Sequence, residues 1–154
     1  MSTRSTYRVI EKGVYEGKAW VSKLVLLYIQ SDGYPSGHPK DTMEWLAGGK
    51  VVNGISMSEK APLIFNGAGC LAAQLVSRMK GYGPGGAYIY NVANRGKAGE
   101  DYTYDIIVDS DTKEISVVAY DVQGGWGNKP LRFKKLYTGA PAGFADWVKK
   151  NEED

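Results

Sequence analysis

The chain has 154 residues, a usual length for one domain and enough to bury a core without disulfides or metals. Its 19 Lys and Arg against 17 Asp and Glu give a formal net charge of +2, which excludes a bulk attraction to nucleic acid or to an anionic membrane. The single cysteine, Cys70, excludes an internal disulfide framework, and no run approaches the roughly 18 apolar residues that span a bilayer. We therefore expect a cytoplasmic protein that is neither exported nor embedded.

The first part of the chain predicts two strands and a turn-rich loop. Tyr7–Ile10 is a short strand-like segment, and Val21–Gln30 contains a nearly continuous apolar run at residues 24–29. Such a run is typical of a strand that is covered on both faces. It stops at residues 31–37, where turn formers cluster.

Two helices are expected in the middle of the chain. The first begins near His38, because a proline follows it, and ends at Gly48–Gly49, where we expect a left-handed cap. After an extended piece at 50–55 and a strand at Pro62–Phe65, the second helix runs from about Gly67 to Lys80. Its apolar residues recur at helical spacing, which indicates core packing.

Four further strands and a final helix complete the predicted fold. The turn at residues 109–112 joins two of these strands and indicates an antiparallel meander, and the last helix starts near Pro141. Apart from the piece at 50–55, the order β-β-α-β-α-β-β-β-β-α predicts one α+β domain over residues 1–154. We expect a mainly antiparallel sheet with two central helices and a C-terminal helix packed on it. The four strands are expected at Ala87–Val92, Tyr102–Val108, Glu114–Tyr120 and Leu131–Tyr137.

Four segments carry a resemblance to a known family. They are MSTRS at residues 1–5, YIQSDGYPSGH at 28–38, VVNGI at 51–55 and FNGAGCLAAQL at 65–75. These motifs resemble a family of small proteins of unassigned function, found mainly in bacteriophages and prophages, and the similarity covers most of the chain. The resemblance implies a phage setting, with the host cytoplasm as the compartment. Small phage proteins without enzyme motifs often inhibit host defence, for example by sequestering cyclic or ADP-ribose-like nucleotide signals, but this step is an analogy of setting.

The predicted start of the second helix is the first candidate binding element. Asn66, Gly67 and Gly69 follow a predicted strand, and glycines there let backbone N–H groups approach an anion at the positive end of the helix dipole. A dinucleotide fingerprint is incomplete, because Ala72 stands where a third glycine would be. The alternative is a tight turn in which Asn66 caps the helix.

The segment Gln30–His38 is the second candidate element. Asp32, Tyr34 and His38 bring a carboxylate, a phenol and the only imidazole into one loop at the end of a strand, where binding sites are often built. His38 with Asp32 could act as a general base, yet the chain has no second histidine to serve as its acid partner. The alternatives are turn chemistry for Asp32 and Tyr34 and a helix-terminal role for His38.

Arginines add a third candidate element. Arg4 could share a strand face with Arg8 and meet a phosphate there, and Arg95 lies with Lys97 in a loop that we expect to be a flexible tip. Solvated surface charge is the alternative for both pairs. Several tyrosines, with Trp126, could stack on bases, although sheet packing explains most of them.

Metal and cofactor binding have little support in the sequence. One histidine and one cysteine cannot form a zinc set without carboxylates, and no spaced acidic cluster of the calcium-loop type is present. Cys70 lies in an apolar helical stretch, so we expect a buried small hydrophobe and not a nucleophile. We predict no cofactor and no metal.

Three functions remain open at this point. The leading hypothesis is a binding protein for a small nucleotide or another phosphorylated metabolite; a protein that inhibits a host factor by surface contact and a nucleotide-cleaving enzyme using His38 and Asp32 are the alternatives. We expect neither polymeric nucleic acid nor membrane as a partner, and a homo-oligomer stays open. The candidate ligand-binding residues are Arg4, Gln30, Asp32, Tyr34, His38, Asn66, Gly67 and Gly69.

Overall fold

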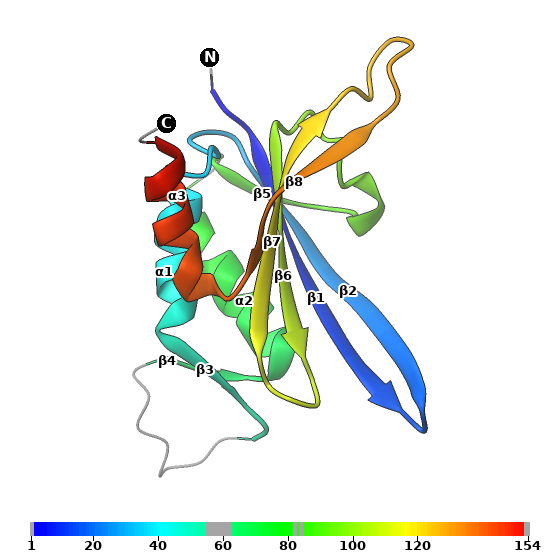
Figure 1. Ribbon diagram of the computed structural model, residues 1–154, viewed down its shortest axis with the longest axis vertical. Helices are drawn as coiled ribbons and strands as arrows, with labels where there is room; N and C mark the ends of the chain where they lie inside the picture. Colours follow the sequence, from blue (N-terminus) through cyan, green and yellow to red (C-terminus); the bar gives the residue numbers. More distant parts are fainter. Residues whose placement is uncertain (1, 55–62, 82, 84, 153–154) are drawn as a thin grey trace.

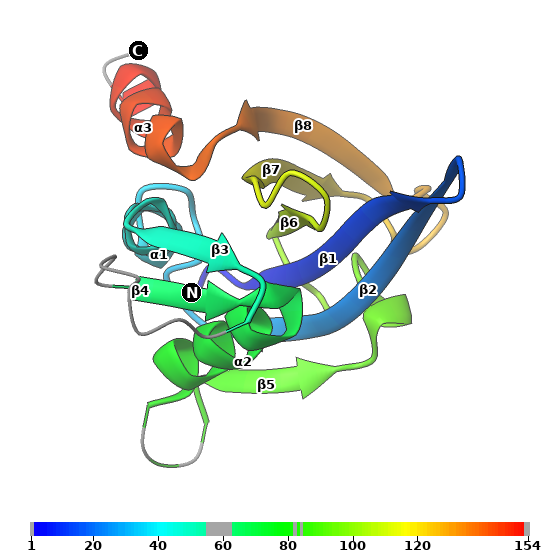
Figure 2. The same ribbon diagram turned by 90° about the horizontal axis from the view of Figure 1, so that it is seen from below.

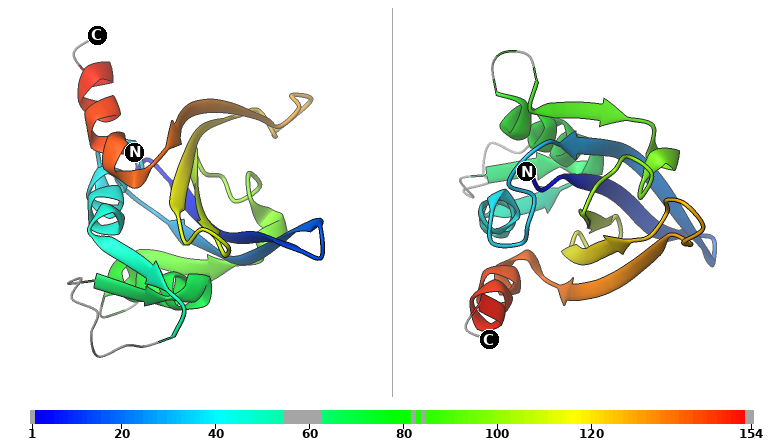
Figure 3. Two further views of the ribbon diagram at one scale, coloured as in Figure 1. Left: turned by 60° about the horizontal axis from the view of Figure 1, so that its bottom comes forward. Right: turned by 90° about the horizontal axis from the view of Figure 1, so that it is seen from above.

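The protein is built on one curved six-stranded sheet. The computed structural model describes residues 2–54, 63–81, 83 and 85–152. The strand order across the sheet is β5-β2-β1-β6-β7-β8, and the curvature is clear in both views of Figure 3. The strands are β1 (Ser5–Tyr15), β2 (Lys18–Ile29), β5 (Ala87–Tyr90), β6 (Tyr102–Asp109), β7 (Ile115–Gln123) and β8 (Arg132–Gly139).

The helices all lie against one face of this sheet (Figures 1 and 2). Beside them, two short parallel strands form a second sheet. Two 3₁₀ turns, Val92–Asn94 and Pro141–Gly143, complete the regular structure. The helices are α1 (His38–Ala47), α2 (Gly67–Lys80) and α3 (Phe144–Glu152), and the short strands are β3 (Gly49–Val52) and β4 (Leu63–Asn66).

The sheet combines a hairpin with a meander. β1 and β2 are antiparallel neighbours, and β6, β7 and β8 follow one another as an antiparallel meander, as predicted. The two units meet where β1 runs parallel to β6, with Tyr7 opposite Tyr104. All other pairs in this sheet are antiparallel. The predicted element order and the α+β class with a packed C-terminal helix are confirmed.

The hydrophobic core lies between the sheet and the helices. Alternate residues of β1 and β6 face the helices, so Tyr7, Val9, Tyr104 and Ile106 are completely buried. Phe144 of α3 packs edge-on against Tyr104, which holds the C-terminal helix on the sheet. The helices contribute mainly Met43, Leu46, Leu71, Leu75 and Val148 to the same cluster.

Three local expectations were wrong. Gly48 ends α1 with φ −81°, so the expected left-handed cap is absent. The following residue, Gly49, must be a glycine for a different reason, because a Cβ there would overlap the Phe65 ring. The run at 24–29 is buried only from Leu26 onward, since β2 extends past β5. β5 ends at Tyr90, where the Asn91 side chain accepts a hydrogen bond from the Ala93 amide and starts a 3₁₀ turn.

Two expected segments fall partly outside the described residues. The strand at Pro62–Phe65 is present as β4 from Leu63, and the extended piece at 50–55 is present as β3 up to Val52. Ile55 and Pro62 lie outside the described residues. Within the part of the chain that the structure describes, no helix has the length and apolar character needed to cross a bilayer.

Candidate functional site

The loop after β2 is fixed by close backbone packing. Asp32 has a positive φ of 57°, and its carbonyl oxygen accepts a hydrogen bond from the His38 amide across the turn. A Cβ on Gly37 would overlap that carbonyl, and a Cβ on Gly33 would meet the side chain of Ser5. Both glycines are therefore required by space, which explains the Asp-Gly-Tyr-Pro-Ser-Gly pattern in physical terms.

Two buried tyrosines of the sheet hold this loop through hydrogen bonds of their hydroxyl groups. Tyr7 and Tyr104 are neighbours across the parallel β1–β6 pair, and their rings stack with centroids 5.3 Å apart. The Tyr104 hydroxyl donates to the Gly33 carbonyl at 2.7 Å, and the Tyr7 hydroxyl lies 2.7 Å from Nδ1 of His38. Burial raises the pKa of both hydroxyls, so they stay protonated.

His38 anchors the loop, and its ring nitrogens are engaged or shielded inside the protein. The Tyr7 hydroxyl forms a hydrogen bond with Nδ1, so this ring nitrogen is already engaged inside the protein. Nε2 is shielded from solvent and has no hydrogen-bond partner among the described residues. Burial lowers the pKa of His38 to about 4, against smaller opposing effects of Asp32, the Ser31 backbone and Asp41. At neutral pH the ring is uncharged, and its buried Nε2 is poorly placed to take a proton from a substrate.

A pocket of about 760 Å³ opens beside the loop, and we call it the loop pocket. Three of its charged side chains, Asp32, Asp41 and Arg78, are exposed, and no ion pair joins any of them to another described residue. Arg78 stacks over the Trp45 ring at 5.2 Å. The lining is Ile29, Ser31, Asp32, Tyr34, Ser36, Gly37, His38, Asp41, Thr42, Arg78 and Met79.

The structure therefore brings Asp32, Tyr34 and His38 into one pocket, but it places Gln30 and Arg4 beside it. The Gln30 backbone and side chain both bond to Gly86, which ties the loop to the start of β5. Arg4 lines a different pocket, of about 580 Å³, near Asp101. The link between the two pockets is the backbone, because the Gly33 amide donates to the Thr3 carbonyl.

The start of α2 does not join this site. Arg78 in the last turn of α2 lines the loop pocket, so Gly67 in the first turn lies about 17 Å away at 1.5 Å per residue. Figure 1 shows the same separation, with β3 and β4 at the bottom and the loop after β2 at the top. The combined site of loop and helix start is corrected: Asn66, Gly67 and Gly69 form a separate feature.

Asn66 also does not cap α2 with its side chain. Its Oδ1 accepts a hydrogen bond from the Gly54 amide, and it makes no side-chain cap bond to the helix. Gly67 has φ 82°, a left-handed conformation that favours glycine.

Cys70, one turn into the helix, is only partly buried, so the expectation of a buried cysteine is wrong. The Gln74 amide lies 3.3 Å from its sulfur.

Asp41 and Arg78 are the pocket residues that sequence reasoning did not select. Asp41 lies in the first turn of α1, where a negative charge also favours the helix dipole. Arg78 comes from a helix that begins 29 residues after His38, and its sequence neighbours carry no binding pattern. A local sequence signal exists for Asp41, whereas Arg78 is placed by the packing of α2 alone.

The opposite face of the sheet holds the other arginines in a structural cluster. Arg8 and Arg95 both bind the carboxylate of Asp105, each with two hydrogen bonds of 2.7–3.2 Å. The guanidinium of Arg95 also lies over the rings of Tyr120 and Phe133, at 5.0 and 4.4 Å. Arg95 is thus held in place and not at a flexible tip, and Arg8 is already paired with a protein carboxylate.

Among the described residues, no group of three His, Cys, Asp or Glu side chains is arranged to hold a metal ion.

Searches with the chain found no matching family model, no match among curated proteins and no similar solved structure. The geometry of the loop pocket therefore carries the functional argument alone.

Replacing Tyr104 by Phe should weaken the anchor of the loop. The substitution keeps the ring but leaves the buried Gly33 carbonyl without its donor, which we expect to cost about 1–3 kcal/mol of unfolding free energy. Urea unfolding measures this loss. Tyr102→Phe is the matched control, because Tyr102 lies on the same face of β6 without a hydrogen bond to another described residue. Equal losses in the two variants would contradict the role given to Tyr104.

His38 should make the fold sensitive to acid. The unfolded chain protonates this histidine near 6.5, whereas the folded protein keeps it neutral to about 4, so the unfolded state binds more protons between these values. Above pH 6.5 this histidine costs no stability. As the pH falls from 6.5 toward 4, the free energy of unfolding decreases, by up to about 3 kcal/mol for a pKa shift of this size.

The matched variant is His38→Asn, because a side-chain amide can accept or donate the hydrogen bond with Tyr7 without titrating. His38 is the only histidine of the chain, so the difference between the two proteins isolates it from the carboxylates. Chemical unfolding at pH 7.5, 6, 5 and 4.5 measures both. The interpretation fails if wild type and variant lose the same stability over this range.

Proposed function

We propose that this protein binds a small nucleotide-derived ligand in the loop pocket and holds it without converting it. The observation that supports this most is the set of three exposed, unpaired charges, Asp32, Asp41 and Arg78, around one pocket on an anchored loop. Its volume of about 760 Å³ lies within the range of about 300–1,000 Å³ that is usual for small-molecule sites. Charged side chains that form no ion pair with another described residue are available to a ligand.

The charges of the pocket favour one kind of nucleotide. Two carboxylates against one guanidinium disfavour a ligand with several phosphates, because their sum is negative at neutral pH. Asp32 and Asp41 suit the hydroxyl groups of a ribose, and Arg78 suits one phosphate. The ring of Tyr34, which is 41% exposed, offers a surface on which a base can stack. These preferences describe a ribose-containing nucleotide with few phosphates.

Binding without turnover fits the state of His38 better than catalysis does. The alternative enzyme hypothesis needs the imidazole as a base, yet Nδ1 is engaged by Tyr7 and Nε2 is buried. In the phage setting that the sequence resemblance implies, a held nucleotide would be an immune signal withheld from the host, and the protein would act as an anti-defence sponge in the host cytoplasm.

Isothermal titration at pH 7.5 against adenosine, AMP, ADP-ribose, a cyclic dinucleotide and ATP tests the proposal. We expect AMP or ADP-ribose to bind more tightly than ATP, and Arg78→Gln to weaken that binding about 10- to 100-fold, as the loss of a charge-assisted hydrogen bond would. Arg132→Gln, an exposed arginine of β8, is the matched control and should bind normally. Silence across the panel, or equal weakening by the two variants, would contradict the proposal.

The fate of the ligand separates sequestration from catalysis. Heat denaturation of the complex followed by mass spectrometry should return the intact nucleotide after prolonged incubation. A new product that is absent with His38→Ala would instead support the nucleotide-cleaving enzyme.

A second candidate function is inhibition of a host factor by surface contact. The specific observation is the β7–β8 hairpin, which projects from the sheet in Figure 1 and carries Trp126 with 65% of its surface exposed. Large exposed aromatic side chains are frequent anchors of protein interfaces.

Pull-down from host lysate with wild type and Trp126→Ser tests this second candidate. We expect a defined host protein to be retained by wild type and lost with Trp126→Ser. Ile89→Ser is the matched control, since Ile89 is equally exposed, at 64%, and lies on a different strand. A protein retained equally by all three would not be bound through this hairpin.

A further inference from the structure

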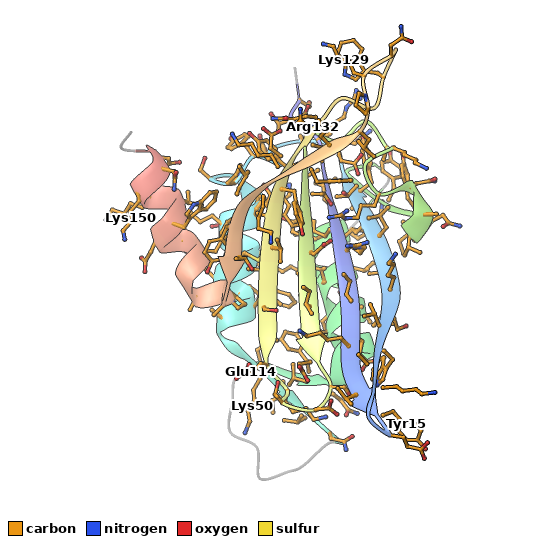
Figure 4. The ribbon with its side chains drawn as sticks, turned by 45° about the vertical axis from the view of Figure 1, so that its right-hand side comes forward. Tyr15, Lys50, Glu114, Lys129, Arg132 and Lys150 are labelled. Carbon is orange, nitrogen blue, oxygen red and sulfur yellow. The ribbon has the colours of Figure 1, made fainter. Side chains whose placement is uncertain are left out.

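The β1–β2 hairpin extends well beyond the rest of the sheet as a two-stranded ribbon. β6 pairs with β1 only as far as Lys12, and β5 pairs with β2 only at residues 26–29. Figure 1 shows this ribbon leaving the body of the protein, and Figure 4 shows Tyr15 at its end. From Lys18 to Val25, one edge of β2 is bonded to β1, and no described strand pairs with the other edge.

The remaining edges of the sheet are protected in recognisable ways. On the ribbon, the Val14 amide of β1 donates to the Asp111 carboxylate at 2.8 Å, which occupies that edge. β8 carries Arg132, Lys134 and Lys135, and charged side chains discourage edge-to-edge pairing. β5 has only four residues. Short strands and charges are common devices against such pairing.

The free edge of β2 is longer than that of β5, and its lysines, Lys18 and Lys23, stand only at its two ends. Residues 18–23 contain no proline, and Val21 is 64% exposed at their centre. The register shift between Val9 and Ile10 leaves Leu24 without a partner and so limits the free ladder to residues 18–23. An exposed, extended edge with apolar side chains is a template for another strand.

We propose that two copies of this chain pair antiparallel through this edge of β2, about a twofold axis at Val21. In an antiparallel pair, residues directly opposite each other point to the same face, so an axis through one residue preserves both faces of the sheet. This axis places Val21 opposite the partner's Val21 and Trp20 opposite the partner's Ser22. Ala19 then faces the partner's Lys23, so no two lysines are opposed across the new ladder.

The self-complementary edge favours a second copy over an unrelated strand. The apolar Val21 side chains cover each other at the axis, and Lys18 and Lys23 on each side are kept apart by the register. With five residues of each copy, 19–23, in the ladder, the interface is small, so we expect a dimer that dissociates on dilution to micromolar concentrations.

Sedimentation velocity from micromolar to near-millimolar concentration tests the pairing. Wild type should shift with concentration from 16.8 kDa toward twice that mass, and Val21→Asp, which opposes two carboxylates at the axis, should stay at 16.8 kDa. Ile89→Asp is the matched control with the same 64% exposure on β5, and it should dimerise like wild type. A wild type that stays monomeric throughout, or an Ile89→Asp that abolishes the shift, overturns the proposal.

A crosslink gives a second measurement that does not depend on a destabilising charge. Opposed residues of an antiparallel pair have Cα atoms about 4.5–5.5 Å apart, within the span of a disulfide. Val21→Cys in a Cys70→Ser background should therefore form an intermolecular disulfide under mild oxidation, seen as a dimer on a non-reducing gel. Ile89→Cys in the same background should stay monomeric. Equal crosslinking of the two variants would mean random collision and would contradict the axis at Val21.

Discussion

The stacked pair of Tyr7 and Tyr104 is the contact on which the rest of the structure depends. It lies where the β1–β2 hairpin and the β6–β7–β8 meander meet, in the parallel pair that joins them into one sheet. The same two rings carry hydroxyl groups that reach His38 and Gly33 and so fix the loop after β2. One buried aromatic pair therefore holds together both halves of the sheet and the wall of the loop pocket.

This arrangement decides what the loop can do. His38 gives its Nδ1 to Tyr7 and buries its Nε2, so the imidazole serves the fold and is uncharged at neutral pH. The groups left for recognition are those that the anchor does not use: Asp32, Asp41, Arg78 and the exposed ring of Tyr34. Their excess of negative charge moves the expected ligand from a polyphosphate toward a ribose-bearing nucleotide.

Charged side chains are paired on one face of the sheet and exposed at its edges. Opposite the helices, Asp105 binds Arg8 and Arg95, which ties Arg95 and the segment between β5 and β6 to the sheet and removes these arginines from any phosphate site. At the edges, β8 keeps its cations in solvent, whereas the ribbon end of β2 keeps an exposed valine between Lys18 and Lys23. Local charge, more than the net charge of +2, distinguishes the surfaces of this protein.

The sequence by itself determined the order of elements, the α+β class and the loop from Asp32 to His38, because turn residues and apolar periodicity act over a few neighbours. The glycines at 33 and 37 and the helix start at His38 are read correctly from such local patterns. Only the tertiary structure decided which candidates share a site. It separated Asn66 from the loop by the length of α2, and it added Arg78 from the far end of that helix. It also turned Arg95 inward onto Asp105, since the pairing depends on the fold of the segment between them and leaves no trace in the residues next to Arg95.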